Sequence, residues 1–374
     1  MNKSGKSLGS ATELVDVALL VGGRSTEHGF SVSMFQNFVE QLSQTNDGQV
    51  RITNVVYLST DGQVYVHEVS EGQPLLSLTN RLQSGEAWTV ERLCATFRQS
   101  KQFVFSLIQG REGEDGQLQG LAGVLGLNGN FSNVYAAAMG IDKWTSSVLA
   151  QEIMSPKVRR IPTMVVRLNE LSNGIREAIR QFGDIECVIK PNALNGSLFI
   201  RILPRLTEGV LLEYARELQG YDDRFLIQPR LRGREITCGI LYIDGIPSAL
   251  PVAEIKHGGD FFSYNEKYET HGFKIVFPAE EAAIAEIRSA SLSLAEWVDF
   301  HTMCRIDYIL TDSDEIYFLE VNPLPGLLSS SIYPRMLREE GLTLSDFILL
   351  SARNDAVYQK RRAEQIRAIQ RFRS

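Results

Sequence analysis

The chain has 374 residues, a net charge of −7 at pH 7, and an ordinary globular composition with 44% hydrophobic and 22% charged residues. This length allows two or three structural units. The negative charge disfavours a nucleic-acid partner, because phosphate binding needs a basic surface. No apolar run reaches the roughly 18 residues of a membrane span, so no membrane partner is expected. Four widely spaced cysteines without C-x-x-C spacing favour reduced, mostly buried thiols and a cytoplasmic location.

The first part of the chain predicts a Rossmann-like α/β domain at residues 14–131, after a small, polar and presumed disordered tail at 1–13. An apolar strand, a glycine-containing loop and an amphipathic helix open it, and such alternation is typical of α/β units. Residues 60–100 are interpreted as an insertion, with 71–100 lacking regular structure. The expected strands and helices lie at 16–21, 31–42, 51–58, 64–69, 103–108 and from about 117 onward.

Two further domains are predicted, a small central one at residues 132–227 and a strand-rich C-terminal one at 228–356. In the central domain, a loop at 191–197 joins two strands and is expected to be mobile. The basic segment 357–374 is predicted to be a solvated helix rather than one docked on an acidic surface. The expected elements lie at 133–151, 161–167, 170–182, 187–190, 198–203, 224–228, 235–243, 250–255, 280–300 and 344–354.

Two apolar runs flank the turn-forming residues 311–314 and predict a β-hairpin. If the loop is the pair 313–314, Arg305 lies opposite Asn322 and Asp307 opposite Glu320. Side chains alternate along a strand, so all four would share one face. Two carboxylates facing each other are destabilising without a cation, and such oxygen ligands suit Mg²⁺ on nucleotide phosphates. A solvated hairpin with a surface ion pair is the alternative.

Two lysines are candidates for binding phosphate. Lys190 ends an apolar strand just before Pro191, where a fully solvated lysine is poorly explained. Lys143 follows a helical segment and, taken alone, fits an ordinary surface position equally well.

Between about residues 17 and 350 the chain contains eight short sequence words: GGRSTEH at Gly22, GEDGQLQG at Gly113, IDK at Ile141, VIKP at Val188, GREI at Gly233, EKY at Glu266, RIDY at Arg305 and LEVNPLPG at Leu319. In this order they resemble the D-alanine–D-alanine ligase family of the ATP-grasp superfamily. The resemblance implies an α/β, three-domain ATP-grasp architecture: a Rossmann-like N-terminal domain, a small α+β central domain and a larger α+β C-terminal domain. It also implies an ATP- and Mg²⁺-dependent ligase that activates one amino acid as an acyl phosphate and joins it to the amine of a second.

The same resemblance implies roles for individual residues, small-molecule amino-acid substrates and a homodimer. Asp307, Glu320 and Asn322 match the ligands of two Mg²⁺ ions. Arg305 and the backbone N–H of Gly326 match the donors to a tetrahedral oxyanion. The other matches are Glu27 for the ammonium of the first amino acid, Tyr268 in a catalytic lid, Gln109, Lys267, Ser331 and Ile332 around the substrates, and Lys143, Lys190, Ser197, Gln228 and Glu235 around ATP.

Four positions depart from the family pattern. In the phosphate-covering loop, Phe199 stands where the family has Gly and Gly196 where it commonly has Ser. The usual lid contact of a Glu, a Ser and a Tyr therefore cannot form in the same way, and Ser197 is a candidate substitute. Gln228 replaces a Glu that accepts from adenine, but a Gln carbonyl also accepts. Gln109 replaces a His near the amino-acid site.

Three functional hypotheses follow. The first is a D-alanine–D-alanine ligase of peptidoglycan biosynthesis. The second is a ligase of a natural-product pathway, such as a siderophore or peptide antibiotic, with other substrates. The third is a non-catalytic ATP-binding regulator, against which Arg305 argues, because a sensor has no need of an oxyanion-stabilising arginine. Substrate identity and stereochemistry stay open.

Overall fold

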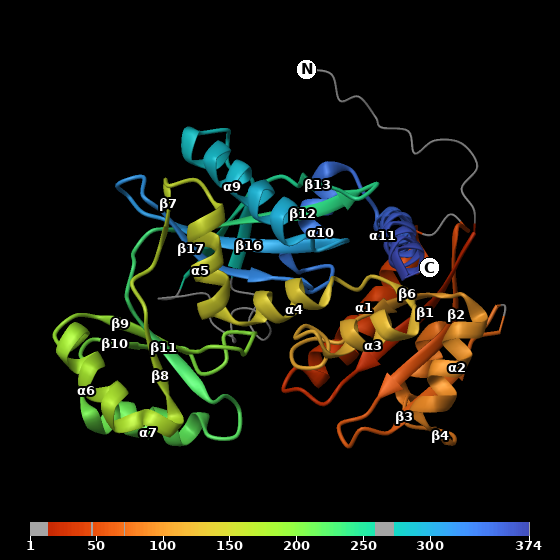
Figure 1. Ribbon diagram of the computed structural model, residues 1–374, viewed down its shortest axis with the longest axis horizontal. Coiled ribbons are helices and arrows are strands. Elements are labelled where there is room, and N and C mark those ends of the chain that lie inside the picture. The colour runs from red at the N-terminus through yellow and green to blue at the C-terminus, as the bar shows by residue number, and fades with distance from the viewer. Residues whose placement is uncertain (1–13, 46–47, 71, 259–272, 374) are drawn as a thin grey trace.

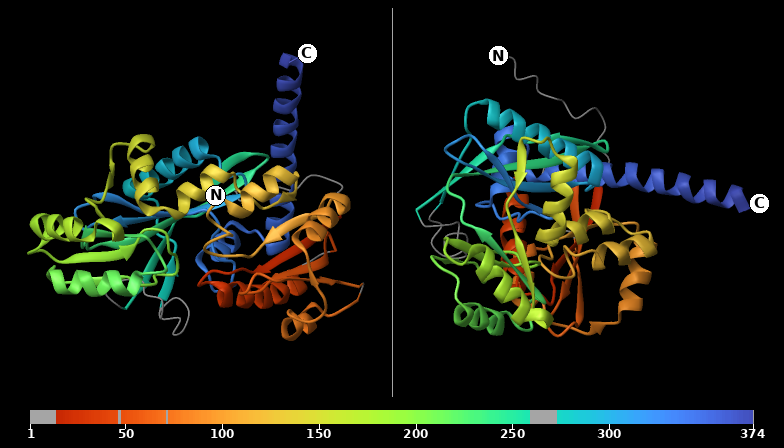
Figure 2. Two further views of the ribbon diagram at one scale, coloured as in Figure 1. Left: turned by 60° about the horizontal axis from the view of Figure 1, so that its bottom comes forward. Right: turned by 60° about the vertical axis from the view of Figure 1, so that its left-hand side comes forward.

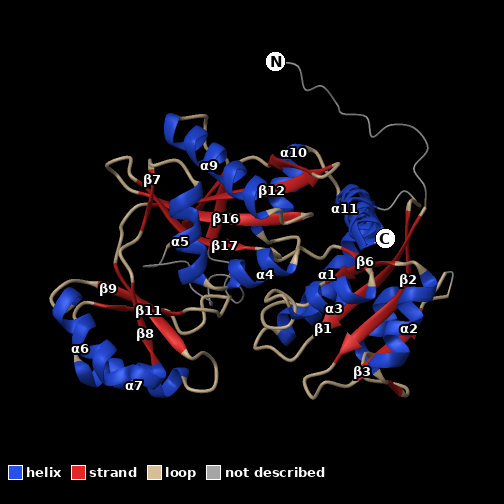
Figure 3. Ribbon diagram, viewed as in Figure 1, coloured by secondary structure: helices blue, strands red, loops and turns tan. Residues whose placement is uncertain are grey.

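The computed structural model describes residues 14–45, 48–70, 72–258 and 273–373, which form three β-sheets with helices packed against them (Figures 1 and 3). The first sheet has the order β4-β3-β2-β1-β5-β6, in which β1 pairs in parallel with β2 and β5. This confirms the predicted α/β opening of the chain. Its strands are β1 Val15–Gly22, β2 Val50–Leu58, β3 Val64–Glu68, β4 Ala87–Trp88, β5 Phe103–Ser106 and β6 Asn128–Gly129.

Three helices belong to this first unit: α1 (His28–Thr45), α2 (Val90–Ser100) and α3 (Gln117–Leu125). The prediction that residues 71–100 lack regular structure is wrong, because a 3₁₀ helix (Leu75–Arg81), β4 and α2 lie there. The Thr89 side chain accepts from the backbone N–H of Arg92 and so caps α2. Phe97 of α2 is buried with the sheet residues Val56 and Val104. A single apolar stripe therefore holds a largely polar helix on the sheet.

The central sheet is antiparallel, with the order β10-β9-β11-β8, and is covered by α6 (Leu171–Phe182) and α7 (Glu208–Leu218). Its hydrophobic core is its own and includes Ile189, Tyr214 and Phe225. Figure 1 shows this unit set apart from the rest of the chain. Its strands are β8 Met164–Arg167, preceding a short 3₁₀ turn at Leu168–Glu170, β9 Cys187–Pro191, β10 Arg201–Leu203 and β11 Arg224–Pro229.

The third sheet has the order β15-β14-β12-β16-β17-β7, with β13 paired to β12. One face packs on α9 (Ala282–Val298) together with α4 (Val134–Ile141) and α5 (Lys143–Ile153). Helices α4 and α5 share the hydrophobic core of this third sheet. The predicted domain boundary near residue 132 stays a prediction. The strands are β7 Val158–Arg160, β12 Arg234–Ile243, β13 Ile246–Ala249, β14 Ala253–His257, β15 Phe273–Val276, β16 Met303–Leu310 and β17 Ile316–Asn322.

The first and third sheets share one hydrophobic core. It joins Phe38 of α1 to Leu241 of β12, Tyr333 of α10 (Ile332–Glu340) and Phe347 of α11 (Leu344–Arg373). The site is therefore framed by one body made of the first and third units and by a central unit with a separate core.

Helix α11 is continuous from Leu344 to Arg373, which confirms that the basic C-terminal segment is helical. Its first half packs between the first and third sheets, and its end projects from the body (Figure 2). Residues 364–372 are all exposed. In the described segments, no helix is both long and apolar enough to cross a bilayer.

Helix α4 packs tightly against the end of β17, and this contact can be tested. A methyl group on Gly140 would lie 3.0 Å from two ring carbons of Pro323, the residue after β17. We expect Gly140→Ala to lower the free energy of unfolding by about 1–3 kcal/mol, because the rigid ring cannot yield.

Gly209→Ala in α7 is the matched control, since nothing lies within 4 Å of the added methyl group. It should be neutral or stabilising by up to about 1 kcal/mol. Thermal or urea unfolding measures both variants, and equal losses in the two would show that the Pro323 contact is unimportant.

Candidate active site

The β16–β17 hairpin has the predicted pairing at its base. Arg305 lies opposite Asn322, and Asp307 lies opposite Glu320. The apolar residues between them on β16 and β17 face the core that α9 covers. The four polar side chains therefore gather on the other face of the third sheet, as the strand alternation predicts.

The two-residue loop assumed for that register is wrong. Regular pairing ends at Leu310 and Ile316, so the loop comprises residues 311–315. A register shift between Asp307 and Tyr308 compensates for the longer loop and restores the predicted pairing at the base. A β-bulge of this kind adds one unpaired residue to one strand.

Asp307 is the centre of a hydrogen-bond network in this ligand-free structure. Arg305 donates to both of its oxygens, at 2.9 Å from Nε and 2.8 Å from Nη2. The hydroxyl of Thr237, on the neighbouring strand β12, donates at 2.6 Å, and the Asn322 side-chain amide donates at 3.1 Å. A nearly buried carboxylate is thus compensated by one cation and two neutral donors.

Lys143 and Lys190 both lie at this site, as predicted, and both are buried. The Lys143 ammonium lies 3.4 Å from Glu320 Oε2 and donates to the carbonyl of Leu194 at 2.7 Å. Burial lowers the pKa of the Lys190 ammonium to about 8; Lys143 adds to this effect, while Glu320 and Glu235 oppose it. A polyanion bound here would stabilise the charged form of Lys190.

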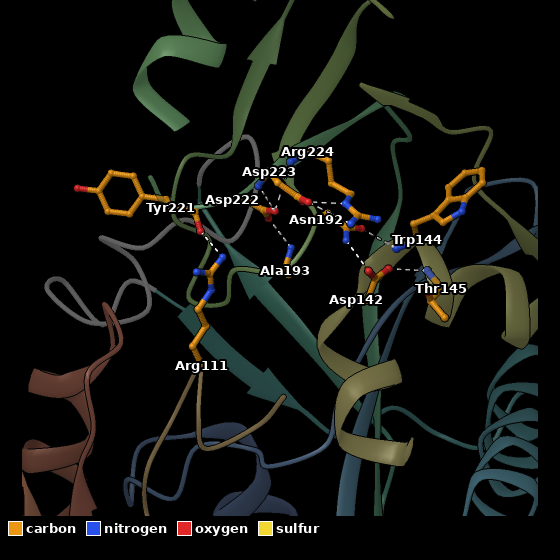
Figure 4. A network of polar contacts seen from close by, with 10 residues as sticks. All are labelled: Arg111, Asp142, Trp144, Thr145, Asn192, Ala193, Tyr221, Asp222, Asp223 and Arg224. Atoms are coloured by element: carbon orange, nitrogen blue, oxygen red, sulfur yellow. Dashed lines mark hydrogen bonds and ion pairs between the residues drawn. The ribbon is translucent and has the colours of Figure 1, made fainter. Parts of the chain in front are cut away.

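A polar network joins the start of α5 to the start of the loop after β9 (Figure 4). Asp142 caps α5 by accepting from Thr145 N, and it also accepts from the Asn192 side chain at 2.8 Å. The Asn192 side-chain oxygen accepts from Trp144 N, and its backbone carbonyl accepts from Lys143 N. Helix α5 and the end of β9 are thereby fixed to each other, which places the two lysines at one site.

The same loop is tied down and sharply bent. Buried Asp222 accepts from Ala193 N at 2.7 Å. Ser197 and Phe199 have φ values of +60° and +59°, in the left-handed region that residues other than glycine rarely adopt. A left-handed backbone at 199 accounts for the glycine that the family has at this position. The Phe199 ring packs on Tyr221, with centroids 4.9 Å apart, and on the central core.

Two pockets meet at Arg305 and Glu320, which line both of them. The first lies between the first and third units and collects the residues predicted to surround the amino acids: Glu27, Gln109, Gly326, Ser331 and Ile332. The second lies between the central and third sheets and collects most of those predicted to surround the nucleotide: Lys190, Ser197, Gln228, Glu235 and Asp307. Lys267 and Tyr268 lie outside the described residues.

Gln228, the predicted departure at the adenine position, is buried on β11. Its side-chain amide donates to Thr163 Oγ1 at 2.8 Å. This bond orients the Gln228 carbonyl oxygen as the acceptor that remains for a ligand. Gln109 is buried in the first pocket, where its backbone carbonyl accepts from the Ser25 hydroxyl at 2.7 Å.

Glu114 is a site residue that the sequence interpretation did not assign, although it belongs to the word GEDGQLQG. It lines the first pocket and is only 2% exposed. Its Oε2 accepts from Gly110 N at 2.5 Å and from the Asn195 side chain at 2.9 Å. Burial, followed by the negative charge of Glu27, raises the pKa of the Glu114 carboxyl to about 8. The available signal was an acidic residue close to several glycines in the loop that follows a buried strand.

The donor set on the hairpin fits a hard divalent cation. Asp307, Glu320 and Asn322 present two carboxylates and one amide from adjacent positions of paired strands, and such oxygen ligands suit Mg²⁺. Among the described residues, there is no group of three His, Cys, Asp or Glu side chains that would form a self-sufficient metal site.

Comparison with known proteins gives consistent similarities. The family models described as D-ala D-ala ligase N-terminus and C-terminus match residues 16–129 and 163–350. A D-alanine–D-alanine ligase of Coxiella burnetii (strain Dugway 5J108-111) is 27% identical over 350 residues, covering 88% of this chain and 90% of that protein.

Solved structures show the same fold. The D-alanine–D-alanine ligase from Coxiella burnetii superposes with a TM-score of 0.74 at 23% identity, over 97% of this chain and 100% of that one. VanG D-Ala:D-Ser ligase from Enterococcus faecalis gives 0.72 at 25% identity, over 92% and 100%. The Bacillus anthracis ligase complexed with ATP gives 0.62 at 20%, over 93% and 99%. The predicted ATP-grasp architecture is confirmed.

The raised pKa of Glu114 predicts a pH dependence of stability. The group titrates near 4.5 in an unfolded chain and near 8 in the fold. Between these values the native state binds more protons than the unfolded state, so stability falls as pH rises. We expect Glu114→Gln to remove this dependence. As the pH rises from 4.5 to 8, the free energy of unfolding of the variant should increase relative to that of the wild type by about 1–4 kcal/mol.

Unfolding free energies of both proteins across this pH range test the prediction. Glu112→Gln serves as the control, because Glu112 lies in the same loop but pairs with the exposed Arg24. Parallel pH profiles for wild type and Glu114→Gln would contradict the assignment.

Proposed function

The chain belongs to the D-alanine–D-alanine ligase family, and from that membership we propose that it is an ATP-dependent ligase joining two amino acids through an acyl phosphate. The observation that carries the proposal is the meeting of two pockets at Arg305 and Glu320. A carboxylate in one pocket can there reach a phosphate in the other, which is the proximity that phosphoryl transfer requires.

ATP would lie in the pocket between the central and third sheets. Lys143 and Lys190 supply two buried cations for its phosphates, and α5 begins at Lys143, so its N-terminus adds a favourable dipole. Gln228 offers its carbonyl oxygen to the adenine amino group. Glu235 lines the same pocket and is held by His257 at 3.1 Å, and Ser197 is the hydroxyl that the loop contributes.

Asp307, Glu320 and Asn322 would hold Mg²⁺, with two ions expected from the family. Bound there, the metal would neutralise phosphate charge during transfer. Arg305 pairs with Asp307, and Lys143 pairs with Glu320.

The first amino acid would place its ammonium on Glu27, whose side chain is buried beside Gly110. Its carboxylate attacks the γ-phosphorus, the bond to the ADP oxygen breaks, and an acyl phosphate forms. The second amino acid would be held near Ile332, with its carboxylate bound by Ser331 and Lys267, and its amine then attacks the acyl carbon. Phosphate leaves and the new amide loses a proton.

Arg305 and the backbone N–H of Gly326 would donate to the oxyanion that forms during this attack. An added Cβ at Gly326 would lie 3.0 Å from the Phe30 ring, so a side chain at this position would press into the pocket wall. Tyr268 is proposed to act in the lid that keeps water from the acyl phosphate.

D-alanine is the proposed amino acid at both positions, with peptidoglycan precursor synthesis as the setting. D-serine, named for the VanG ligase, and other amino acids or amines remain alternatives, because Gln109 and Gly196 alter the amino-acid pocket. The homodimer and the cytoplasmic location are likewise proposals.

The function is tested by release of ADP and phosphate from ATP, with and without Mg²⁺, against D- and L-amino acids singly and in pairs. Mass spectrometry identifies the products. We expect D-alanine alone to yield its dipeptide. Turnover only with other substrates would replace D-alanine and keep the ligase chemistry, whereas nucleotide binding without amide formation across the panel would favour a non-catalytic regulator.

Arg305→Ala tests the oxyanion assignment. We expect nucleotide binding to persist and turnover to fall about 10²–10³-fold, the usual loss on removing one oxyanion donor. Steady-state kinetics and nucleotide titration measure the two effects. A thermal melt provides the control, because the change also uncovers the buried Asp307 carboxylate. Wild-type turnover in a folded variant would remove Arg305 from the mechanism.

A further inference from the structure

The loop at residues 109–116 of the first unit makes two hydrogen bonds to the central unit. Arg111 Nη2 donates to the Tyr221 carbonyl at 2.6 Å (Figure 4), and the Asn195 side chain donates to Glu114 Oε2 at 2.9 Å. The first bond lies at the exposed rim. The second lies inside the amino-acid pocket, which Glu114 and Asn195 both line.

Both partners of the inner bond are held in place by their own surroundings. Glu114 is fixed by its second bond to Gly110 N, within a backbone turn closed from Gly110 O to Glu114 N at 2.9 Å. Asn195 directly follows Leu194, whose carbonyl accepts from Lys143. The bond therefore joins the wall of the amino-acid pocket to a loop already in contact with a phosphate-binding lysine.

The family's usual lid contact requires a serine that this chain lacks at position 196. Three of the residues after Asn195 have positive φ: Gly196, Ser197 and Phe199. The loop thus folds back over the nucleotide pocket, with Phe199 anchored on Tyr221 at one end. At the other end, the Asn195 side chain donates its hydrogen bond to Glu114 of the first unit.

We propose that the Asn195–Glu114 hydrogen bond is the contact that closes the phosphate-covering loop onto the amino-acid site in this chain. Glu114 and Asn195 are positioning residues: they hold the loop that covers the phosphates. The inference rests on the proposed function for the identity of the two ligands, and on geometry alone for the contact itself.

The electrostatics of the pocket make this contact responsive to the first substrate. Glu27 and Lys143 are the charged groups that act on Glu114, and the negative charge of Glu27 disfavours its ionised form. An ammonium bound on Glu27 would offset that charge. Glu114 would then ionise more readily and accept more strongly from Asn195, because hydrogen bonds to charged acceptors are the stronger ones. Amino-acid binding would thus tighten the cover over ATP.

The test compares wild type with Asn195→Ala, Glu114→Gln and the double variant. Affinity for the non-hydrolysable analogue AMP-PNP with Mg²⁺ is measured together with hydrogen exchange of the 192–200 amides. We expect Asn195→Ala to weaken binding by up to about tenfold and to speed exchange, because one hydrogen bond is lost. Glu114→Gln keeps a neutral acceptor and should lose less. The double variant should match Asn195→Ala, because without the donor the second change has nothing left to remove.

Glu112→Gln is the matched control, since it removes a carboxylate from the same loop whose partner, Arg24, lies within the first unit. It should leave both readouts unchanged. The proposal is overturned if Asn195→Ala binds AMP-PNP and exchanges as the wild type does. It is equally overturned if the effects of the two single changes multiply in the double variant.

A further measurement separates this inference from the proposed function. In a working ligase, Asn195→Ala should release more than one phosphate per amide formed, because water reaches the acyl phosphate. A wild type that forms no amide would reject the ligase proposal, while nucleotide affinity and loop exchange still decide whether the contact closes the loop.

Discussion

The negative charge on one face of the β16–β17 ladder must be compensated, and the arrangement around the site follows from that requirement. Asp307 and Glu320 face each other across the two strands. Arg305, on the same ladder, pairs with Asp307, whereas Lys143 comes from α5 to reach Glu320. Because the compensating cations come from separate elements, the helix and the sheet have to meet at one place. Under the proposed function, the phosphates of ATP and their Mg²⁺ would bind at this place.

The three units differ in whether they share a hydrophobic core. The first and third units share one core, and the pocket proposed for the amino acids lies between them. The central unit has its own core, and its loops reach the site through polar contacts such as those of Asn192 and Asn195. Polar contacts exchange with water at little net cost, so a movement of this unit would expose no shared core.

Sequence patterns predicted the site best where a simple periodicity governs it. The alternation along β16 and β17 predicted that the polar side chains share one face, and apolar flanks placed Lys190 inside. The predicted pairing of Asp307 with Glu320 rested on a loop length that was wrong, and it holds because the bulge compensates. The bulge and the loop at 311–315 were missed, because no residue type marks an extra unpaired position. Helix α2 was missed because its sequence is largely polar and only Phe97 of the helix is buried. Glu114 escaped notice because its importance arises from Gly110 and Asn195, which only the folded chain brings to it.

The bulge after Asp307 has a consequence for how this hairpin can vary. It separates the pairing at the base of the hairpin from the pairing near its tip, so the two need not share one register. Residues 312–314 at the tip are exposed, and β16 is also anchored by its pairing with β12. The tip is therefore a permissive position, at which added or altered segments would leave the ladder below undisturbed. It offers an attachment point for a label or a new recognition sequence on a working enzyme.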